Sequence, residues 1–344
     1  MLFDAPDFDA HEAVHFVSAP SAGLHAIIAI HSTFRGPAAG GSRYWSYASD
    51  VDALTDALRL SRGMSYKNAM ADLPMGGGKA VVFKAGTKTE ALLEAFGRAI
   101  ESLGGRYVTA EDVGMTVHDM TVIARRTRHV SGLPVAGGAA GGNPGPSTAD
   151  GVFAGMRAAV HHKLGRDGFA GVHVAIQGLG SVGGGLAERL AAAGARLTVA
   201  DADDARAARM AAALGARHVP SATITTVAAD VFSPNALGGI LDAATVAALD
   251  VAVVAGAANN QLATPADGAR LAARGILYAP DYVINAGGTI NVVAEYNGNG
   301  DAATVAVGIA AIEPRLAAIF AEADATGLST DAVADAKARA LIGR

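Results

Sequence analysis

The sequence contains no cysteine among its 344 residues, and tryptophan occurs only once. Without cysteine the chain can form no disulfide, no thiolate metal site and no cysteine nucleophile. Aromatic residues are also scarce at 5%, whereas hydrophobic residues reach 51% and glycines number 43. This composition argues against low-complexity disorder and indicates a compact α/β protein, long enough to form two domains.

Long charged or apolar runs are missing as well. The net charge is −5 and no long basic block occurs, so neither nucleic acid nor an anionic membrane is an expected partner. No uncharged apolar run of about 18 residues has the character of a membrane span. The first seven residues are acidic and lack the basic and apolar regions of a signal peptide. We therefore expect a cytoplasmic protein.

No metal site is expected either, although residues 11–15 match the zinc-protease pattern H-E-x-x-H. That chemistry needs both histidines on one face of a helix. Here the motif opens a predicted strand, where residues four positions apart are separated by roughly 13 Å. His11 and His15 are therefore interpreted as ordinary strand side chains.

The chain is organised around residues 64–79, in which two lysines stand twelve positions apart. A predicted helix precedes this stretch and a strand-like run, residues 80–83, follows it. Gly76, Gly77 and Gly78 are predicted to form a bend that holds Lys79 against a small ligand, because glycine permits close backbone approach. A partly desolvated lysine beside a second cation is suited to act as a base. From these residues alone, a glycine turn with two surface lysines is an equal alternative.

Other features of the first half surround this stretch. Residues 12–17 and 24–30 predict a β-hairpin. Residues 36–43 predict a tight loop, in which the N–H groups of Gly40 and Gly41 suit a carboxylate, although a plain turn explains them equally well. Asp112 follows a short predicted strand, residues 107–110, where catalytic side chains are common. A turn or cap aspartate is the alternative interpretation of Asp112.

The second half contains a dinucleotide-binding pattern. A buried strand ending at Ile176 is followed by G-x-G-x-x-G, residues 178–183, and then by a predicted helix. A second strand ends in Asp201, 23 residues beyond the first glycine. This context makes the motif far more specific than the glycines alone. The pyrophosphate would lie on the helix N-terminus, and Asp201 would bind the ribose 2′-OH and repel a 2′-phosphate, which favours NAD over NADP.

The remaining segments complete a predicted doubly wound sheet. Short strands near residues 231–232, 251–254 and 276–278 alternate with helical segments. The glycine- and proline-rich residues 136–147 predict a linker. We therefore expect a first domain over residues 1–134, with helices of 313–344 packing back on it, and a Rossmann domain over residues 147–312.

With both halves considered, nearly the whole chain resembles the glutamate/leucine/phenylalanine/valine dehydrogenase family. The resemblance rests on five motifs in the same order: residues 36–41, 73–79, 111–114, 178–183 and 279–288. It implies an α/β fold in which a substrate domain with a mixed sheet and a Rossmann domain flank an active-site cleft. It also implies NAD-dependent, reversible oxidative deamination of an L-amino acid to its 2-oxo acid and ammonia, by a homo-oligomer.

The resemblance also implies roles for individual residues. Lys67, helped by the backbone at Gly40 and Gly41, resembles the group that holds the substrate α-carboxylate. Lys79 resembles the catalytic lysine that activates water, and Asp112 the aspartate that exchanges a proton with the amino group. The expected cofactor-binding residues are Thr148, Gly178, Gly180, Ser181, Val182, Gly183, Asp201, Ala255, Asn260 and Asn285, of which Asn260 also lies near the amino group.

The pocket for the substrate side chain is expected to be apolar. The glutamate enzymes hold the side-chain carboxylate with a lysine and a serine, at positions that correspond to Ala39 and Val292 here. A glutamate carboxylate would therefore be buried without a partner, at a cost of roughly several kcal/mol. Ala110 adds a small apolar wall, whereas Thr289 occupies a position that is usually apolar. The motifs do not decide between leucine, valine and phenylalanine as substrate. A glutamate-type enzyme and a catalytically silent NAD-binding sensor are the alternatives.

Overall fold

The computed structural model describes the chain except for residues 1, 6, 85, 135–139 and 299. It forms two compact units. Unit 1 comprises Met1–Pro144, Thr289–Val305 and Ala338–Arg344, and unit 2 comprises Gly145–Gly288 and Ala306–Lys337. Each contains its own sheet with helices, which confirms the predicted two-domain α/β class. Residues 136–139 of the predicted linker lie outside the described residues, and helix α4 begins at Gly145 within that linker.

Unit 1 is built on a six-stranded mixed sheet in the order β1-β2-β5-β3-β6, with β4 also paired to β5. The strands β1, β2 and β5 are antiparallel, whereas β3 and β4 run parallel to β5. Its strands are β1 (Ala13–Ala19), β2 (Leu24–Ser32), β3 (Ala38–Ala39), β4 (Ser42–Trp45), β5 (Gly76–Phe83) and β6 (Tyr107–Val108). Its helices are α1 (Asp50–Met70), α2 (Glu90–Glu101) and α3 (Val117–Ala124), with 3-10 turns at Leu2–Asp4 and Pro20–Ala22.

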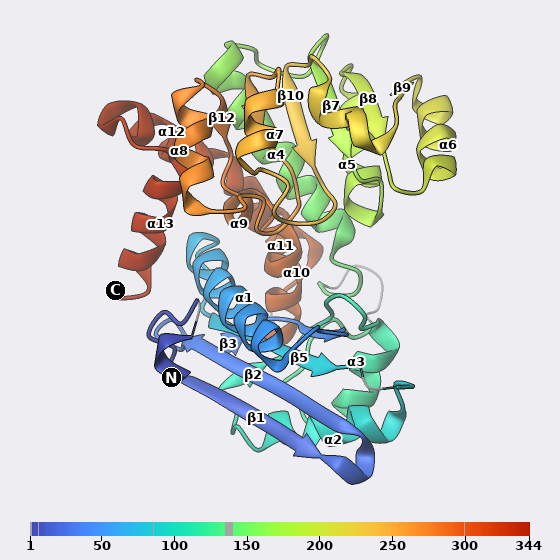
Figure 1. Ribbon diagram of the computed structural model, residues 1–344, viewed down its shortest axis with the longest axis vertical. Helices are drawn as coiled ribbons and strands as arrows, with labels where there is room; N and C mark the ends of the chain where they lie inside the picture. Colours follow the sequence, from blue (N-terminus) through green and yellow to red (C-terminus); the bar gives the residue numbers. More distant parts are fainter. Residues whose placement is uncertain (1, 6, 85, 135–139, 299) are drawn as a thin grey trace. The chain divides into compact units, whose positions relative to one another are not determined.

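Helices cover both faces of this sheet (Figure 1). Alternate residues of β2 point to opposite faces, as the period of a strand requires. Ile28 and Ile30 pack in the cluster that contains α2 and α3, whereas Ile27 and Ala29 pack in the cluster that contains α1. Burial on both sides explains why residues 26–30 of β2 are continuously apolar in the sequence. The predicted hairpin of β1 and β2 is confirmed.

The three consecutive glycines do not form the predicted bend. Gly76, Gly77 and Gly78 are the first residues of β5, and none of them has a positive φ. A Cβ on Gly77 would lie 2.0 Å from the backbone nitrogen of Ser65 in α1. A Cβ on Gly76 would lie 2.0 Å from the carbonyl oxygen of Ser32. The glycines are therefore required by the close approach of the neighbouring backbone to β5 rather than by a turn.

The predicted loop at residues 36–43 is likewise partly regular. Ala38–Ala39 form β3, and Ser42 begins β4, so only Gly40 and Gly41 remain between two strands. A Cβ on Gly40 would lie 1.9 Å from the carbonyl oxygen of Gly78. This glycine also serves close packing between neighbouring strands.

Unit 2 contains a parallel sheet in the order β12-β11-β10-β7-β8-β9, the arrangement of a doubly wound dinucleotide-binding fold. Its strands are β7 (His173–Gln177), β8 (Arg196–Ala200), β9 (Arg217–His218), β10 (Val231–Pro234), β11 (Val253–Val254) and β12 (Leu277–Tyr278). Its helices are α4 (Gly145–Leu164), α5 (Ser181–Ala192), α6 (Asp204–Leu214), η3 (Ser221–Thr226), α7 (Ala243–Ala248), α8 (Pro265–Ala273), α9 (Asp281–Ile284) and α12 (Ile312–Thr326).

Three helices pass from one unit to the other along the chain: α10 (Gly287–Tyr296), α11 (Ala302–Ala310) and α13 (Thr330–Leu341). The division therefore differs from the expected domains at the C-terminal end. Most of residues 313–344 belong to unit 2, and only Ala338–Arg344 join unit 1. There, Arg339 pairs with Asp9 at 3.2 Å and Arg344 donates to the carbonyl oxygen of His31.

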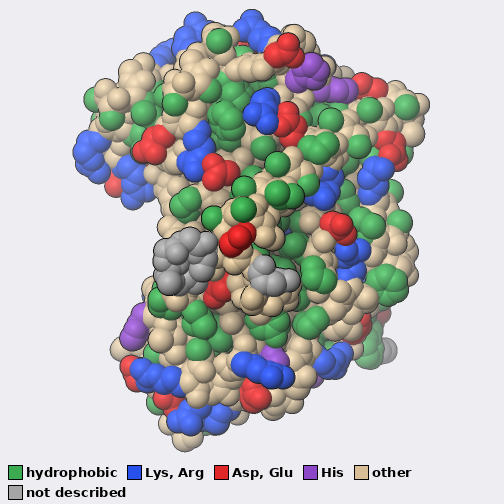
Figure 2. All heavy atoms as spheres, turned by 180° about the vertical axis from the view of Figure 1, so that it is seen from behind, with side chains coloured by type: hydrophobic (Ala, Val, Ile, Leu, Met, Phe, Trp, Pro, Cys, Tyr) green, Lys and Arg blue, Asp and Glu red, His purple; other side chains and the backbone are tan. Residues whose placement is uncertain are grey.

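Acidic and basic side chains are interspersed among apolar ones on the face shown in Figure 2. Ion pairs such as Arg125–Glu90 and Arg126–Glu94 join charges of opposite sign on the surface of unit 1. Within the part of the chain that is described, one helical stretch, Ala302–Thr326, is long and apolar enough to cross a membrane, a property that core helices of soluble proteins share.

Candidate active site

Lys79 lies in the middle of β5 and faces α1. It pairs across the sheet with Ala29, whose side chain packs in the cluster under α1. Only 5% of Lys79 is exposed, and its Nζ lies 3.0 Å from Oδ2 of Asp112. A buried ammonium group needs a partner of opposite charge, and Asp112 supplies it.

Asp112 reaches Lys79 because the backbone at Gly41 allows it. Ser42 forms an isolated parallel bridge with Glu111, next to Asp112. A Cβ on Gly41 would lie 2.4 Å from the carbonyl oxygen of Glu111 and 3.0 Å from Cβ of Asp112. Any larger residue at position 41 would therefore displace the aspartate.

Arg43 is a third charged group at this site, and the sequence analysis did not single it out. Its Nε lies 3.0 Å from Oδ2 of Asp112, the same oxygen that Lys79 contacts. A second nitrogen of the Arg43 guanidinium, Nη1, lies 2.9 Å from Oδ2 of Asp56 on α1. Tyr47 donates its hydroxyl hydrogen to the same Asp56 oxygen at 2.6 Å. The result is a chain of contacts from Lys79 through Asp112 and Arg43 to Asp56 and Tyr47.

These charges determine the protonation state of Asp112. Burial raises the pKa of this carboxyl, but the positive charges of Lys79 and Arg43 outweigh the burial and lower the pKa to about 2. Asp112 is therefore ionised at neutral pH and can accept a proton. Arg43 is thus a cation near Lys79 that was not identified from the sequence.

Lys67 lies in the last turn of α1. Glycines of the sheet lie beside that helix, namely Gly77 of β5 and Gly40, between β3 and β4. The expected carboxylate-binding N–H groups are not equivalent. Gly40 donates its N–H to the carbonyl oxygen of Val108 at 3.1 Å, so this N–H is already used within the sheet. Gly41 donates no backbone hydrogen bond among the described residues. Only Gly41 therefore keeps an N–H that a ligand could use.

A small apolar cluster forms next to these residues in unit 1. Ala39 packs with Met75, Val108 and Val293, and Tyr296 lies at its margin. Thr289 lies on the same helix, α10, four residues before Val293 and therefore on the same face, whereas Val292 directly precedes Val293 and lies about 100° around the helix from it. Ala110 follows β6, and its carbonyl oxygen accepts the N–H of Ser42. The structure thus brings Ala39 close to α10, although the two are some 250 positions apart in sequence.

Asn68 fixes the wall of this cluster from α1. Its fully buried amide donates to the carbonyl oxygens of Gly76, at 2.5 Å, and Ala39, at 3.4 Å. Asn68 therefore ties the helix that carries Lys67 to the strand that carries Ala39.

In unit 2, the glycine motif joins β7 to α5 as predicted. Gly178 has a φ of +87°, and a Cβ on Gly183 would lie 2.0 Å from the carbonyl oxygen of Gly178. A Cβ on Gly180 would meet nothing within 4 Å. The first and third glycines are thus required by the turn and by packing, whereas open space lies above Gly180, before the first α5 residues Ser181 and Val182.

Asp201 stands at the end of β8, beside the glycine turn. Its carboxylate accepts the N–H of Leu179 at 2.6 Å and the N–H of Asp203 at 2.8 Å. Arg206 of α6 lies 3.6 Å from the same carboxylate. Burial raises the pKa of Asp201, but these bonds and Arg206 together lower it, so the group is an anion. Arg206 was not identified from the sequence.

The other predicted cofactor residues lie at the ends of the central strands of unit 2. Ala255 follows β11 and is buried, and Asn260 has a φ of +51°, a conformation that asparagine tolerates. Asn285 donates to the carbonyl oxygen of Ala257 and to the amide oxygen of Asn259, while its own Oδ1 is buried and accepts no bond within the described residues. Thr148 lies in the first turn of α4, where a Cβ on Gly287 would lie 3.3 Å from its Cα.

Comparison with known proteins gives the same result for both units. The dimerisation domain of the Glu/Leu/Phe/Val dehydrogenases matches residues 11–129, and the Glutamate/Leucine/Phenylalanine/Valine dehydrogenase model matches residues 202–323. Leucine dehydrogenase of Geobacillus stearothermophilus is 48% identical over 299 residues, which is 86% of this chain and 81% of that protein. Valine dehydrogenase of Streptomyces virginiae is 46% identical over 335 residues, 96% of this chain and 93% of that protein. The chain belongs to the glutamate/leucine/phenylalanine/valine dehydrogenase family.

A solved structure supports this amino-acid dehydrogenase assignment at the level of the fold. The crystal structure of L-tryptophan dehydrogenase from Nostoc punctiforme superimposes with a TM-score of 0.83 at 42% identity, covering 97% of this chain and 96% of that one. The resemblance inferred from the motifs is thereby confirmed.

The residues of this dehydrogenase also fit a dinucleotide. The open space above Gly180 leaves room for a pyrophosphate at the N-terminus of α5, and the buried, unpaired Oδ1 of Asn285 offers an acceptor at the strand ends. Both features are what a nicotinamide dinucleotide needs. Asp201 and Arg206 place opposite charges beside the glycine turn.

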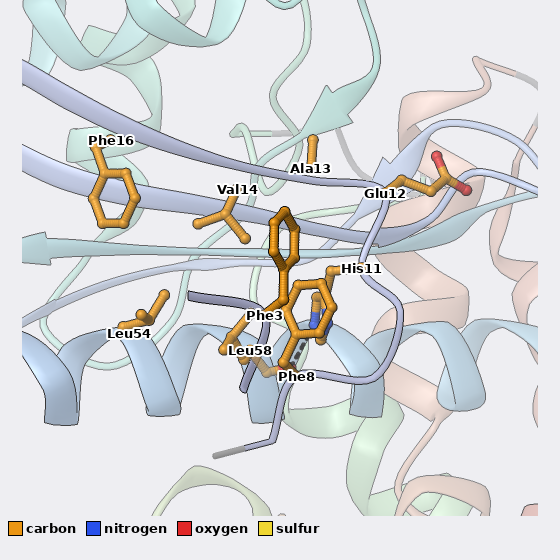
Figure 3. Close-up of a pocket in the computed structure, with 9 residues that line it drawn as sticks. All are labelled: Phe3, Phe8, His11, Glu12, Ala13, Val14, Phe16, Leu54 and Leu58. Carbon is orange, nitrogen blue, oxygen red and sulfur yellow. Dashed lines mark hydrogen bonds between the residues drawn. The ribbon is translucent and has the colours of Figure 1, made fainter. Parts of the chain in front are cut away.

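A separate hollow lies at the surface of unit 1, away from Lys79. Figure 3 shows the rings of Phe3 and Phe8 from the N-terminal segment beside Leu54 and Leu58 of α1 and Val14 and Phe16 of β1. His11 lines it, and its Nε2 lies 3.0 Å from the carbonyl oxygen of Leu58, to which it donates, and 3.0 Å from the hydroxyl oxygen of Ser61. The described residues that line this hollow include no lysine or aspartate, the charged residue types of the candidate active site.

Proposed function

We propose that this family member catalyses the reversible, NAD-dependent oxidative deamination of a hydrophobic L-amino acid. The amino acid, NAD⁺ and water yield the 2-oxo acid, ammonia, NADH and a proton. The buried contact of Lys79 with Asp112 carries this proposal, because the reaction needs a base and a proton acceptor beside the amino group. The similarity to leucine and valine dehydrogenases over most of the chain supports it.

The roles of the substrate residues follow from their chemistry. Lys67 and the free N–H of Gly41 bind the α-carboxylate. Asp112, an anion at neutral pH, accepts a proton from the substrate ammonium group. After hydride has left Cα, Lys79 takes a proton from the water that attacks the imine carbon. Asp112 then returns its proton to the amino nitrogen, and the C–N bond breaks to release ammonia as the new hydroxyl group loses its proton to the Asp112 carboxylate. Asn260 lies near the amino group in this arrangement.

The glycine turn of unit 2 would hold the cofactor, which would supply the acceptor for the hydride of the substrate Cα. Gly178, Gly180 and Gly183, with Ser181 and Val182, form the pyrophosphate site, and Thr148, Ala255, Asn260 and Asn285 hold the nicotinamide end. Asp201 binds the ribose hydroxyls and opposes a 2′-phosphate, which supports NAD. Arg206, a cation beside Asp201, would attract a 2′-phosphate, so it limits the preference for NAD over NADP.

The substrate side chain occupies the apolar cluster of unit 1. Ala39, Ala110 and Val292 offer it no charge, so a glutamate carboxylate would lose its hydration without gaining a partner. Thr289 adds one hydroxyl to the wall. The relatives at 42–48% identity are named for activities on leucine, valine and tryptophan, which are apolar amino acids. Leucine, valine and phenylalanine are therefore the proposed substrates.

The decisive experiment measures NADH formation with each L-amino acid in turn. We expect apolar amino acids to exceed glutamate in kcat/KM, whereas equal rates with glutamate would contradict the pocket assignment. Because transfer into a mismatched pocket costs several kcal/mol, the gap should be at least about 100-fold. No NADH formation with any amino acid, despite NAD binding, would instead identify an NAD-binding sensor.

Assembly and location complete the proposal. We propose a homo-oligomer in the cytoplasm, with unit 1 as the substrate domain and unit 2 as the cofactor domain. The match of residues 11–129 to a dimerisation domain supports self-association. Light scattering of the purified protein would give the number of subunits, and a monomeric mass would refute this part.

A further inference from the structure

The peptide group between Gly40 and Gly41 is held by a side chain rather than by the sheet of unit 1. The hydroxyl of Tyr107, on β6, donates to the carbonyl oxygen of Gly40 at 2.6 Å. Among the described residues, no backbone N–H donates to this carbonyl oxygen. The carbonyl and the N–H of Gly41 belong to the same peptide group, so Tyr107 binds the group that carries this N–H.

The residues on either side of that N–H are fixed to the neighbouring chain segment. Gly40 donates its own N–H to the carbonyl oxygen of Val108 at 3.1 Å, and Ser42 donates to that of Ala110 at 2.9 Å. Gly41 lies between these two bonds, is buried, and donates to no backbone acceptor in the part of the chain that is described. Buried N–H groups without an acceptor are rare in folded proteins. The unused N–H therefore points to an acceptor supplied by a ligand.

The bond from Tyr107 determines the direction of this N–H. Because a peptide group is planar, the Gly40 carbonyl and the Gly41 N–H can only turn together. A hydrogen bond to the carbonyl oxygen also polarises the amide, which strengthens the N–H as a donor. Tyr107 is fully buried, and burial raises its pKa to about 12, so its hydroxyl keeps the hydrogen that it donates.

Two further buried hydroxyls connect Tyr107 to the other side of Gly41. Oγ1 of Thr109 lies 3.5 Å from the hydroxyl oxygen of Tyr107 and is hydrogen-bonded to Oγ of Ser42. Ser42 directly follows Gly41 in the chain, so the three hydroxyls hold the residues on both sides of the N–H. Removing one of these hydroxyls would leave its buried partners without a hydrogen bond.

We propose that Tyr107 is a positioning residue for the substrate α-carboxylate: through the Gly40 carbonyl it aims the Gly41 N–H at a carboxylate oxygen. The inference rests on the proposed function, in which Lys67 and Gly41 bind that carboxylate. Tyr107 takes no part in proton transfer, because its hydroxyl is bonded to backbone. Its loss should therefore weaken the binding of the carboxylate and leave the chemical step unchanged.

The first test compares kinetic constants for the preferred apolar amino acid at saturating NAD. Tyr107→Phe removes the hydroxyl and keeps the ring, so KM should rise by about three- to tenfold, the effect of one hydrogen bond, while kcat stays within about twofold. Tyr44→Phe is the matched control. Tyr44 is also buried in unit 1, and its hydroxyl also donates to the carbonyl oxygen of a glycine, Gly86, at 3.1 Å. This control should leave both constants unchanged.

The second test uses two competitive inhibitors to show which part of the substrate is affected. Isocaproate is leucine without its amino group, and isoamylamine is leucine without its carboxylate. Tyr107→Phe should raise the inhibition constant of isocaproate by about three- to tenfold and leave that of isoamylamine unchanged. A general distortion of the pocket would instead raise both constants. NAD binding and the unfolding temperature of each variant identify any loss of folding.

The outcomes separate this inference from the proposed function. A wild-type enzyme that forms no NADH with any amino acid would overturn the function itself. An active wild type in which Tyr107→Phe changes neither inhibition constant, or raises both equally, would overturn the role of Tyr107 alone. If Tyr107→Phe does not fold, Thr109→Val decides. It removes the hydroxyl between Tyr107 and Ser42, so only isocaproate should bind more weakly, and any other response would overturn the role.

Discussion

Lys79 illustrates how a single side chain acquires a chemical role from its surroundings. In the sequence it is one lysine after a run of glycines, but in the structure it is nearly buried and contacts a carboxylate that Gly41 admits. Burial removes the water that would otherwise take part in unproductive proton exchange, and the partners fix where the nitrogen lies. The surroundings, rather than the residue type, make Lys79 the proposed base.

Replacing this lysine should separate chemistry from cofactor binding. Lys79→Ala is expected to lower kcat by about 10²–10⁴, because a general base typically contributes that factor. NAD affinity, measured by titration of protein fluorescence, should change little, since the glycine turn belongs to unit 2. Lys84→Ala, an exposed lysine just beyond the same strand, is the matched control. A Lys79→Ala enzyme within about threefold of wild-type kcat would refute the assignment.

Cofactor preference depends on two opposed side chains. Asp201→Asn removes the charge that repels a 2′-phosphate and leaves Arg206 to attract it, so the ratio of kcat/KM for NAD to that for NADP should fall, by about tenfold or more. Arg206→Gln should move the same ratio the other way. Measuring both cofactors with both variants tests the site, and a ratio that neither variant alters would show that the ribose binds elsewhere.

At the scale of elements, local motifs could be predicted from the sequence, whereas close packing between distant segments could not. The β7–α5–β8 motif and Asp201 lie within residues 173–201, so the glycines and Asp201 could be identified from spacing alone. The prediction of a bend at Gly76–Gly78 was wrong. Gly76 and Gly77 are required because the backbone of Ser32 and Ser65, which are distant in sequence, lies too close to leave room for a Cβ. Arg43 and Asp56 were missed for the same reason, since their contact corresponds to no local pattern.

The packing of β5 on α1 gives a prediction about stability. Gly77→Ala would place a Cβ 2.0 Å from a backbone nitrogen of α1, which the strand and helix can relieve only by moving apart. Overpacking of this kind costs about 1–3 kcal/mol or more, so the free energy of unfolding should fall by at least that amount.

Gly63→Ala provides the control on the helix itself. A Cβ at this position meets nothing within 4 Å, and alanine favours a helix over glycine by about 1 kcal/mol. Gly63→Ala should therefore be neutral or stabilising in urea unfolding. Equal effects of the two substitutions would mean that the β5–α1 contact is not as close as the structure shows.

Beyond single elements, a buried histidine links segments from both ends of the chain. His31 of β2 bonds through Nδ1 to Ser65 of α1 at 2.8 Å, and its Nε2 lies near both Arg344 and Asp9. Burial first, and then the charge of Arg344, lower the pKa of His31 to about 3. The N-terminal segment, the sheet, α1 and the C-terminal residues thus all meet at a neutral imidazole.

This histidine should make unit 1 sensitive to acid. An unfolded chain binds a proton at His31 below pH 6.5, whereas the folded chain does so only near pH 3. The resulting stability is present above pH 6.5 and is lost as the pH falls towards 3, by roughly 3–5 kcal/mol in all. Asp112 acts in the same direction, but only below pH 4, since its pKa is about 2 in the fold against 3.8 otherwise.

Urea unfolding between pH 7 and pH 4 tests this linkage, because Asp112 stays ionised throughout that range. His31→Gln disturbs the contacts with Ser65 and Arg344, so it should be less stable than wild type at pH 7. Because glutamine cannot take up a proton, the variant should lose less stability than wild type on acidification. His25→Gln, at an exposed position on the same strand, should follow the wild-type curve. The comparison depends on slopes rather than on absolute stabilities, so the cost of the substitution itself cancels. If His31→Gln and wild type decline in parallel, proton uptake at His31 does not drive the acid sensitivity, and its contacts with Ser65 and Arg344 serve packing alone.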